Sequence, residues 1–478
     1  MLFRSGALEV ARDQATRAHR LAAELGLREV VWRALRTLGE IDRRQGDLEA
    51  ARRRWRDAIA LVEQMPAGIE VDRFRAGFLD DKYDLYADLI HLLLRLERPA
   101  AAFAISERAR SASFADMLAR RRFGADGGGP QRAGPAAVRP LGAAAVQTVL
   151  PQRVALVAFH LSQRGCAAFV VRRDRVTAHR LAISRARLRD RIARLRQAIE
   201  QLSPVDQALH QLHGALIEPL AADLRGAAVV GLLPHDALHY LPFAALRPAG
   251  GGWWMDGVRL FRAPSAAGLV HLLQREQQRC GPAGPTLALG DPAPGPDGQR
   301  LPFARLEVRA LAREQAGARA LVGRRASEAA LRRLAGESGL LHLAGHGRFD
   351  AADPLASAIQ LAPGEGHDGR LSAAEVLQLE LQARLVVLSA CQTGVGGLGR
   401  GAEVVGMNRA FLAAGAGGVV SSLWRVGDAA SAVLMKRFYR YLRQQPPVAA
   451  LQRAQALVRR YHPHPAHWAG FFLTGSWF

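Results

Sequence analysis

Cysteine is scarce in this chain, and the scarcity excludes two classes of protein. The 478 residues include three cysteines, Cys166, Cys280 and Cys391, and no two of them have the CxxC spacing. A disulfide scaffold or a cysteine-rich zinc site needs several cysteines at paired spacings. We therefore expect a cytoplasmic protein, kept in a reducing compartment, with no metal site built from cysteine.

Long apolar runs are also missing. No stretch reaches the roughly 18 apolar residues that cross a bilayer, and the first residues, MLFRSGALEVARDQ, lack the apolar core of a signal peptide. The sequence therefore predicts no membrane span. Because the first predicted helix begins almost at residue 1, we expect that further sequence lies upstream.

Lysine is nearly absent, although the net charge is strongly positive. Lysine occurs only at Lys82 and Lys436, so arginine supplies almost all of the 65 basic residues behind the +22 charge. The arginines are spread along helices, as in 183–197, and alanine and glycine are abundant too, which is what GC-rich codons produce. A solvated arginine face explains this pattern. We therefore expect no specific nucleic-acid binding, only weak attraction to acidic partners.

Residues 1–120 are predicted to form helical repeats. Apolar residues recur at spacings of three and four, and proline occurs only at Pro66 and Pro99, where helices should end. In the segment 32–64, small residues surround Trp55 in the way that two touching antiparallel helices require. This segment resembles a tetratricopeptide repeat (TPR).

A TPR-like pair of helices cannot bury its apolar face alone, so neighbouring pairs should stack into a short solenoid with a concave surface. Two interpretations of this region stay open. It is either a groove that binds a protein substrate or an activating partner, or a helical platform that covers the next domain.

Residues 121–145 are predicted to be a linker, because 122–140 is rich in glycine and proline and has almost no apolar content. Residues 146–478 are predicted to be an α/β domain. Apolar runs alternate there with amphipathic helices, which is typical of a mainly parallel sheet covered on both faces. The expected strands lie within 153–161, 166–181, 227–234, 286–292, 339–346, 383–391 and 416–424, and the expected helices include 303–315, 327–336 and 402–414.

Two of the predicted strands end on reactive side chains beside glycines. His346 ends the run LLHLAGH, and Cys391 ends the run LVVLSAC. Taken alone, such a cysteine is usually core filler and such a histidine can satisfy a buried carbonyl. However, ligands bind at the carboxyl ends of strands in open parallel sheets, and the separation of 391 − 346 = 45 residues suits one crossover between adjacent strands. We therefore expect both side chains at one edge of the sheet.

A thiol and an imidazole at one edge can carry out nucleophilic catalysis. The imidazole takes the proton of the thiol and later protonates the leaving amine. Gly347 lets the backbone approach a substrate carbonyl, and its N–H and that of Cys391 are predicted to form an oxyanion hole. The sequence therefore predicts His346 and Cys391 as a catalytic pair.

The motifs HLAGHG and LSACQTG resemble the His-Gly and Ala-Cys signatures of the caspase-like cysteine peptidases. More narrowly, residues 146–478 are similar to the CHAT family, caspase-like domains that usually follow TPRs, and the likeness continues in 232–246, 401–431 and 464–475. The resemblance implies a caspase-haemoglobinase fold with Cys391 as nucleophile and His346 as general base and acid. It also implies cleavage of a protein or peptide substrate through an acyl-enzyme, with no metal or organic cofactor.

The resemblance further implies a pocket beside the cysteine strand for the substrate side chain before the scissile bond. The candidates are Asp428, Trp424 at the end of a predicted strand, and Asp353 on the loop after His346. The Val-Asp-Asp…Thr pattern of the family reads Val-Gly-Asp…Ser over 426–431, so one acidic residue is absent. For both aspartates a helix cap or a turn is the alternative interpretation.

Two functions therefore remain as hypotheses. The first is a cysteine endopeptidase whose TPR-like helices recruit a substrate or an activator, and the second is a catalytically silent caspase-like signalling scaffold. The other histidines that we interpret as structural are His235, His239, His342, His462, His464 and His467.

Overall fold

The computed structural model describes most of the chain. For residues 75–81, Pro354, Cys391, Gln392, 402–405 and Asp428 it describes the backbone alone. The described residues are 8–65, 75–110, 141–279, 284–293, 301–315, 317–348, 350, 353–389, 391–392 and 402–478.

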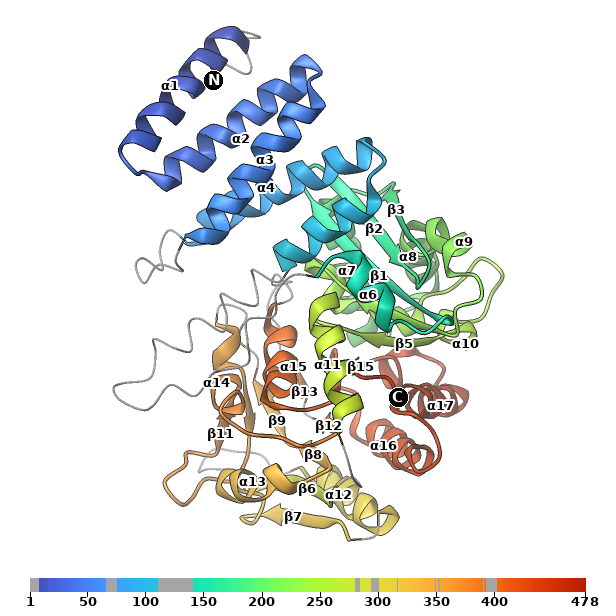
Figure 1. Ribbon diagram of the computed structural model, residues 1–478. Helices are drawn as coiled ribbons and strands as arrows, with labels where there is room; N and C mark the ends of the chain where they lie inside the picture. Colours follow the sequence, from blue (N-terminus) through green and yellow to red (C-terminus); the bar gives the residue numbers. More distant parts are fainter. Residues whose placement is uncertain are drawn as a thin grey trace.

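The N-terminal region is helical, as the repeat pattern predicted, and its helices form an arm that stands on one end of the α/β domain (Figure 1). A β-carbon on Gly39 of α2 would lie 2.5 Å from Nε1 of Trp55 on α3, so only glycine lets the indole ring fit between these helices. Gly46 ends α2 in the left-handed conformation, with φ at 91°. The arm consists of α1 (Leu8–Glu24), α2 (Arg28–Gln45), α3 (Leu48–Gln64), α4 (Arg75–Arg95) and a helix over 99–110.

The α/β domain is built on an eleven-stranded sheet with the order β3-β2-β1-β4-β5-β15-β14-β12-β8-β6-β7. Strands β1, β4, β5 and β15 are parallel, and so are β14, β12, β8, β6 and β7. Because β15 is antiparallel to β14, these two groups run in opposite directions. The strands are β1 (Val154–Ser162), β2 (Gly165–Val171), β3 (Val176–Leu181), β4 (Val229–Leu233), β5 (Arg259–Arg262), β6 (Thr286–Pro292), β7 (Arg319–Gly323), β8 (Leu340–Ala344), β12 (Leu385–Leu388), β14 (Gly418–Ser422) and β15 (Phe471–Gly475).

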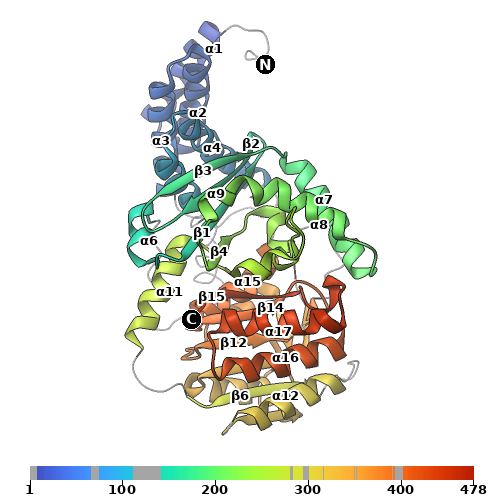
Figure 2. The ribbon, with the colours of Figure 1, turned by 90° about the vertical axis from the view of Figure 1, so that its right-hand side faces the viewer.

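Helices cover both faces of the sheet, as expected for buried parallel strands. On β12, Val387 belongs to the apolar core shared with α12 and α16, whereas Val386 and Leu388 belong to a second core shared with α13, α14 and α15. Figure 2 shows α12, α16 and α17 as one layer in front of the strands. The helices of this half are α11 (Ala266–Gln278), α12 (Pro302–Glu314), α13 (Glu328–Leu334), α14 (Ala373–Val376), α15 (Ala402–Ala414), α16 (Asp428–Leu442) and α17 (Pro447–Tyr461).

A second, four-stranded sheet has the order β11-β10-β9-β13 and follows the ends of β8 and β12. The sequence predicted one helical crossover between those two strands. Instead, the connection contains three short strands and the single turn of α14. The strands of this small sheet are β9 (His346–Arg348), β10 (Ala358–Gln360), β11 (Arg370–Ser372) and β13 (Cys391–Gln392).

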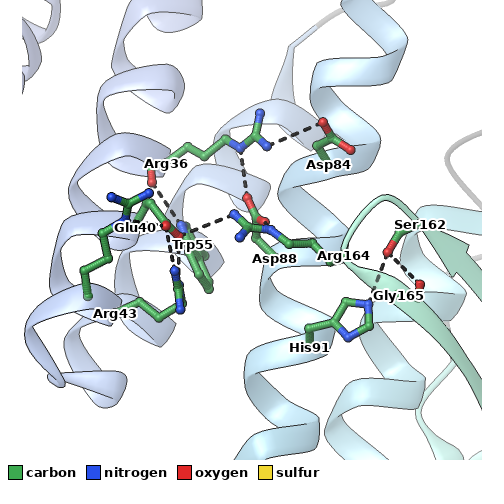
Figure 3. A network of polar contacts seen from close by, with 11 residues as sticks. Arg36, Glu40, Arg43, Trp55, Asp84, Asp88, His91, Ser162, Arg164 and Gly165 are labelled. Carbon is green, nitrogen blue, oxygen red and sulfur yellow. Dashed lines mark hydrogen bonds and ion pairs between the residues drawn. The ribbon is translucent and has the colours of Figure 1, made fainter. Parts of the chain in front are cut away.

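Ion pairs join the arm to the turn between β1 and β2 (Figure 3). Arg164 in that turn donates to Asp88 of α4 at 2.6 Å, and Arg36 of α2 donates to the other oxygen of Asp88 at 3.0 Å. Arg164 also reaches Glu40 at 3.4 Å. Burial by itself would raise the pKa of Glu40, but hydrogen bonds from Arg43 and Arg44 lower it to about 2. The carboxylates of this junction are therefore matched by arginine.

A deeper contact fixes the last helix of the arm to the sheet. Arg110 donates to the carbonyl of Phe159 on β1 at 2.8 Å and to that of Pro234 after β4 at 2.7 Å. Glu107, which is 0% exposed, accepts from Arg110 at 2.9 Å and from the backbone N–H of Ala266 at 2.6 Å. The arm thus satisfies a backbone carbonyl of β1 and one directly after β4.

The predicted linker over 121–145 lies mostly outside the described residues. The helix α6 (Ala143–Val149) begins within its last residues, and the domain boundary stays a prediction. In the described part of the chain, no helix combines the length and the apolar character that a membrane crossing needs.

Candidate active site

His346 opens the short strand β9, two residues beyond the end of β8. The apolar residues of β8 pair in register with those of β12 on one side and β6 on the other, so this strand is fixed in the centre of its half of the sheet. The expectation that the strands before His346 and Cys391 are adjacent and parallel is confirmed. The imidazole of His346 is half-buried at the point where the main sheet gives way to the small one.

Cys391 opens β13, which is parallel to β9. The backbone register pairs Cys391 with His346 and Gln392 with Gly347. Neighbouring strands lie about 4.8 Å apart, so the two backbone positions predicted to form a catalytic pair are direct neighbours. The side chain of Cys391 and the residues 393–401 that follow β13 lie outside the described residues.

Glycines shape the chain around His346. A β-carbon on Gly345 would lie 2.7 Å from the carbonyl oxygen of Gln360, so the turn between β8 and β9 leaves no room for a side chain there. Gly347 lies in the inner strand of the small sheet, opposite Ile359 on one side and Gln392 on the other. The predicted oxyanion hole therefore involves residues whose backbones are fixed by pairing, and it stays a prediction.

The three candidates for a substrate pocket have different surroundings. Asp353 is exposed, and its carboxylate accepts from the N–H of Leu355 at 3.1 Å, which is the cap of a short 3₁₀ helix. Trp424 is 3% exposed, and its indole donates to the carbonyl of Ala466 at 2.9 Å. Asp428 is the first residue of α16, but its side chain lies outside the described residues.

A buried polar cluster beneath β8 and β12 was not predicted from the sequence. We interpreted His342 as structural, and the structure places its Nε2 3.2 Å from Oε1 of Glu307 on α12. Glu307 also accepts from Ser389, two residues before Cys391, at 3.0 Å. The signal in the sequence is an ionisable side chain within an otherwise apolar strand, and its partner is 35 residues away (342 − 307).

The described residues hold no group of three or more histidine, cysteine, aspartate or glutamate side chains arranged to bind a metal ion. Burial raises the pKa of Cys166, on β2, to about 11. That thiol is therefore a poor nucleophile near neutral pH.

Parts of this chain are similar to known proteins. Residues 206–476 match the family described as the CHAT domain. Over 109 residues, 22% of this chain, the sequence is 42% identical to human tetratricopeptide repeat protein 28 and 41% identical to the mouse protein of that name. The matched part spans only 4% of the length of these relatives.

The structure is similar to separase in a crystal structure of the separase–securin complex from Saccharomyces cerevisiae. The TM-score is 0.54 at 13% sequence identity, and the match covers 90% of this chain and 37% of that chain. At this identity the likeness concerns the fold: TPR-like helices followed by a mostly parallel, caspase-like α/β domain.

Proposed function

The chain belongs to the CHAT domain family, with more than half of its length in the match, and on that premise we propose that it is a cysteine endopeptidase. The single observation that carries the proposal is the register of β9 and β13, which sets the backbone of His346 directly opposite that of Cys391. Residues opposite each other on neighbouring strands share a face of the sheet. The chemistry of a thiol–imidazole pair requires that proximity.

In the proposed reaction, His346 takes the proton of the Cys391 thiol, and the thiolate attacks the carbonyl carbon of the scissile peptide bond. The C–N bond breaks as the amine leaves with the proton held by His346, and a thioester remains. Water, giving a proton to His346, then attacks the thioester and releases the carboxylate product and the thiol. The N–H groups of Gly347 and Cys391 are proposed to stabilise the oxyanion that forms in each attack.

We also propose that the arm recruits a protein substrate or an activating protein. Exposed apolar side chains lie on α1, the turn after it and the first turn of α2, in the part of the arm farthest from the sheet in Figure 1. Exposed apolar clusters of this kind mark protein contacts. The residues are Val10, Leu21, Leu25, Leu27 and Val30, which are 42–71% exposed.

A charged substitution on this surface tests the recruiting role. We expect Leu25→Arg to lower the rate of cleavage of a protein substrate and to leave the rate for a short peptide unchanged. An equal decrease in the cleavage rates of the protein substrate and the short peptide would contradict recruitment by the arm.

The substrate pocket is proposed to lie beside the start of α16, with Asp428 as its acidic group. The cap formed by Asp353 and the buried hydrogen bond of Trp424 give those two residues structural contacts. Asp428 is therefore the candidate that we carry forward.

The peptidase proposal is tested by mapping newly formed N-termini in cells that make the wild-type protein, Cys391→Ala or His346→Ala. We expect specific cleavages with the wild type and a loss of at least about 10⁴-fold in either variant, as for other catalytic nucleophiles and bases. Cys166→Ala is the matched control and should cleave like the wild type. If both variants cleave like the wild type, the dyad assignment is wrong. If neither the wild type nor any variant cleaves, and Cys391 is not labelled fast by an electrophilic probe, the signalling scaffold is favoured.

A further inference from the structure

Buried polar side chains form a connected cluster beneath the two strand ends of the proposed dyad. Glu307 of α12, His342 of β8 and Tyr439 of α16 are 6%, 0% and 1% exposed. Ser389 follows β12 directly and is half-buried. Burying such groups is destabilising unless each one has a partner, so their contacts need an explanation.

Glu307 joins the two strands through its two oxygens. Oε2 accepts from the Ser389 hydroxyl at 3.0 Å, and Oε1 lies 3.2 Å from Nε2 of His342. This second contact has the length of an ion pair without the alignment of a hydrogen bond, and neither atom has a hydrogen-bond partner within the described residues. A polar cluster that is only partly satisfied is less stabilising than an apolar core. Stability alone therefore does not account for Glu307 and His342.

Tyr439 holds the other side of the His342 ring, with its hydroxyl 2.7 Å from Nδ1. Burial, followed by the charge of Glu307, raises the pKa of Tyr439 well above its ordinary value. The phenol therefore keeps its proton and can donate it to Nδ1. With Nδ1 as acceptor, the other ring nitrogen, Nε2, is the atom of His342 near the carboxylate of Glu307.

The cluster lies two to four residues before the two residues of the proposed dyad. His342 lies four residues before His346 and pairs in register with Val387 of β12. Ser389 lies two residues before Cys391, and its backbone N–H donates to the carbonyl of Leu343 at 2.9 Å. Ser389 is thus held to β8 by its main chain and to α12 by its hydroxyl, at the point where the chain leaves β12 for β13.

We propose that Glu307, His342 and Ser389 are positioning residues that hold Cys391 in register with His346. The inference rests on the proposed peptidase function. Glu307 is the shared anchor, because it contacts both the strand that leads to the imidazole and the residue that precedes the thiol strand. A displacement of about 1 Å in a reacting pair can lower a rate by about 100-fold, so such an anchor has a measurable effect on the thiol.

The rate at which iodoacetamide alkylates Cys391 tests the proposal in the full chain. Mass spectrometry follows each cysteine separately from pH 5 to pH 9 in the wild type, Ser389→Ala, Glu307→Gln and Tyr439→Phe. We expect Ser389→Ala and Glu307→Gln to slow the reaction of Cys391 by ~10-fold to ~100-fold. The pH of half-maximal rate should move toward that of an ordinary thiol. Tyr439→Phe should give a smaller decrease, and Ser389→Thr, which keeps the hydroxyl, should restore the rate.

Gln455→Leu is the matched control for a loss of buried hydrogen bonds. Gln455 is 4% exposed on α17 and donates to the carbonyls of Trp468 and Phe471. We expect this variant to be less stable than the wild type and to leave the rate at Cys391 unchanged.

The possible outcomes separate the two proposals. If wild-type Cys391 reacts no faster than a free thiol, both the dyad and its positioning are wrong. If wild-type Cys391 reacts fast and the folded Ser389→Ala and Tyr439→Phe proteins react equally fast, the positioning role alone is wrong. These two substitutions remove one hydroxyl each, so the test does not depend on whether Glu307→Gln folds.

Discussion

In the N-terminal half of the main sheet, the last helix of the arm contacts β1 and the end of β4, whereas in the C-terminal half β8 and β12 lead into a second small sheet. These strand ends lie on opposite edges of the sheet, because β15 runs antiparallel to β14. At the first edge, Arg110 occupies the carbonyls of Phe159, Leu233 and Pro234. At the second, the strand continuations bring the backbones of His346 and Cys391 into register.

The comparison shows how similar strand ends acquire different roles. The carboxyl ends of parallel strands are a usual place for ligands. The edge at β1 and β4 is not free to bind a ligand at these carbonyls, because Arg110 already donates hydrogen bonds to them. The edge at β8 and β12 instead extends each strand by a short segment that carries a functional group. The first edge should therefore respond to substitution mainly in stability, and the second mainly in reactivity.

The largest effect on stability is expected from Arg110→Met at the first edge. This variant leaves Glu107 buried without its cation, and removing one partner of a buried pair destabilises a protein by about 3–5 kcal/mol. Equilibrium unfolding in urea measures the loss. The double variant Glu107→Gln, Arg110→Met is the control and should be more stable than Arg110→Met. A single variant as stable as the wild type would show that the arm is not fixed by this pair.

Acidification should weaken the same edge. Burial lowers the pKa of His160 well below its ordinary value, and burial with the charge of Arg110 lowers that of His235 to about 3. Between pH 6.5 and these lowered values, the unfolded chain binds more protons than the folded chain. The free energy of unfolding should therefore be highest above pH 6.5 and fall by about 1 kcal/mol per pH unit for each of these imidazoles below it.

Unfolding of the full chain at pH 7.5 and pH 5.5 measures this dependence. His160→Phe should reduce this slope and leave the contribution of His235, since Nε2 of His160 has no hydrogen-bond partner within the described residues and the ring stacks on His235. The exposed His210 provides the control, because His210→Gln should leave the slope unchanged. An equal slope in His160→Phe would contradict the assignment of the effect to this imidazole.

At the second edge, Gly345→Ala is expected to reduce both stability and activity. Its β-carbon would lie 2.7 Å from the carbonyl of Gln360, so β9 must move relative to β10. Overpacking of this kind lowers the free energy of unfolding by about 1–3 kcal/mol. Unfolding and peptide cleavage measured on the same sample should both decrease. Gly142→Ala is the control, because nothing lies within 4 Å of a β-carbon there.

Much of this second edge could be predicted from the sequence. The strands β6, β8, β12 and β14 are mainly apolar, so their pattern identifies them, and the positions of His346 and Cys391 follow from where two of these segments end. The strands β9 and β13 are two or three residues long, too short for a periodic pattern, so their register could not be predicted.

Other features depend on contacts distant in sequence. Strand β5 contains Arg262, whose guanidinium is buried beneath the ring of Phe472 and donates to the carbonyls of His239 and Leu241. An arginine in a short segment argues against a buried strand when only the local pattern is visible. The pairing of His342 with Glu307 was missed for the same reason: α12 meets β8 only in the folded chain.

The smallest effect is expected at Asp353. Substitutions of this residue distinguish a role as a helix cap from a role in the substrate pocket. Its carboxylate accepts from the N–H of Leu355, and the loss of such a cap in Asp353→Ala should lower the free energy of unfolding by about 0.5–1 kcal/mol. Asp353→Asn keeps an acceptor for the N–H and removes the charge, so it should be as stable as the wild type. If Asp353 only caps the 3₁₀ helix, the Asn variant should cleave peptides with basic and neutral side chains before the scissile bond in the wild-type ratio. A selective decrease in kcat/KM for the basic peptides would instead place the charge of Asp353 in the pocket.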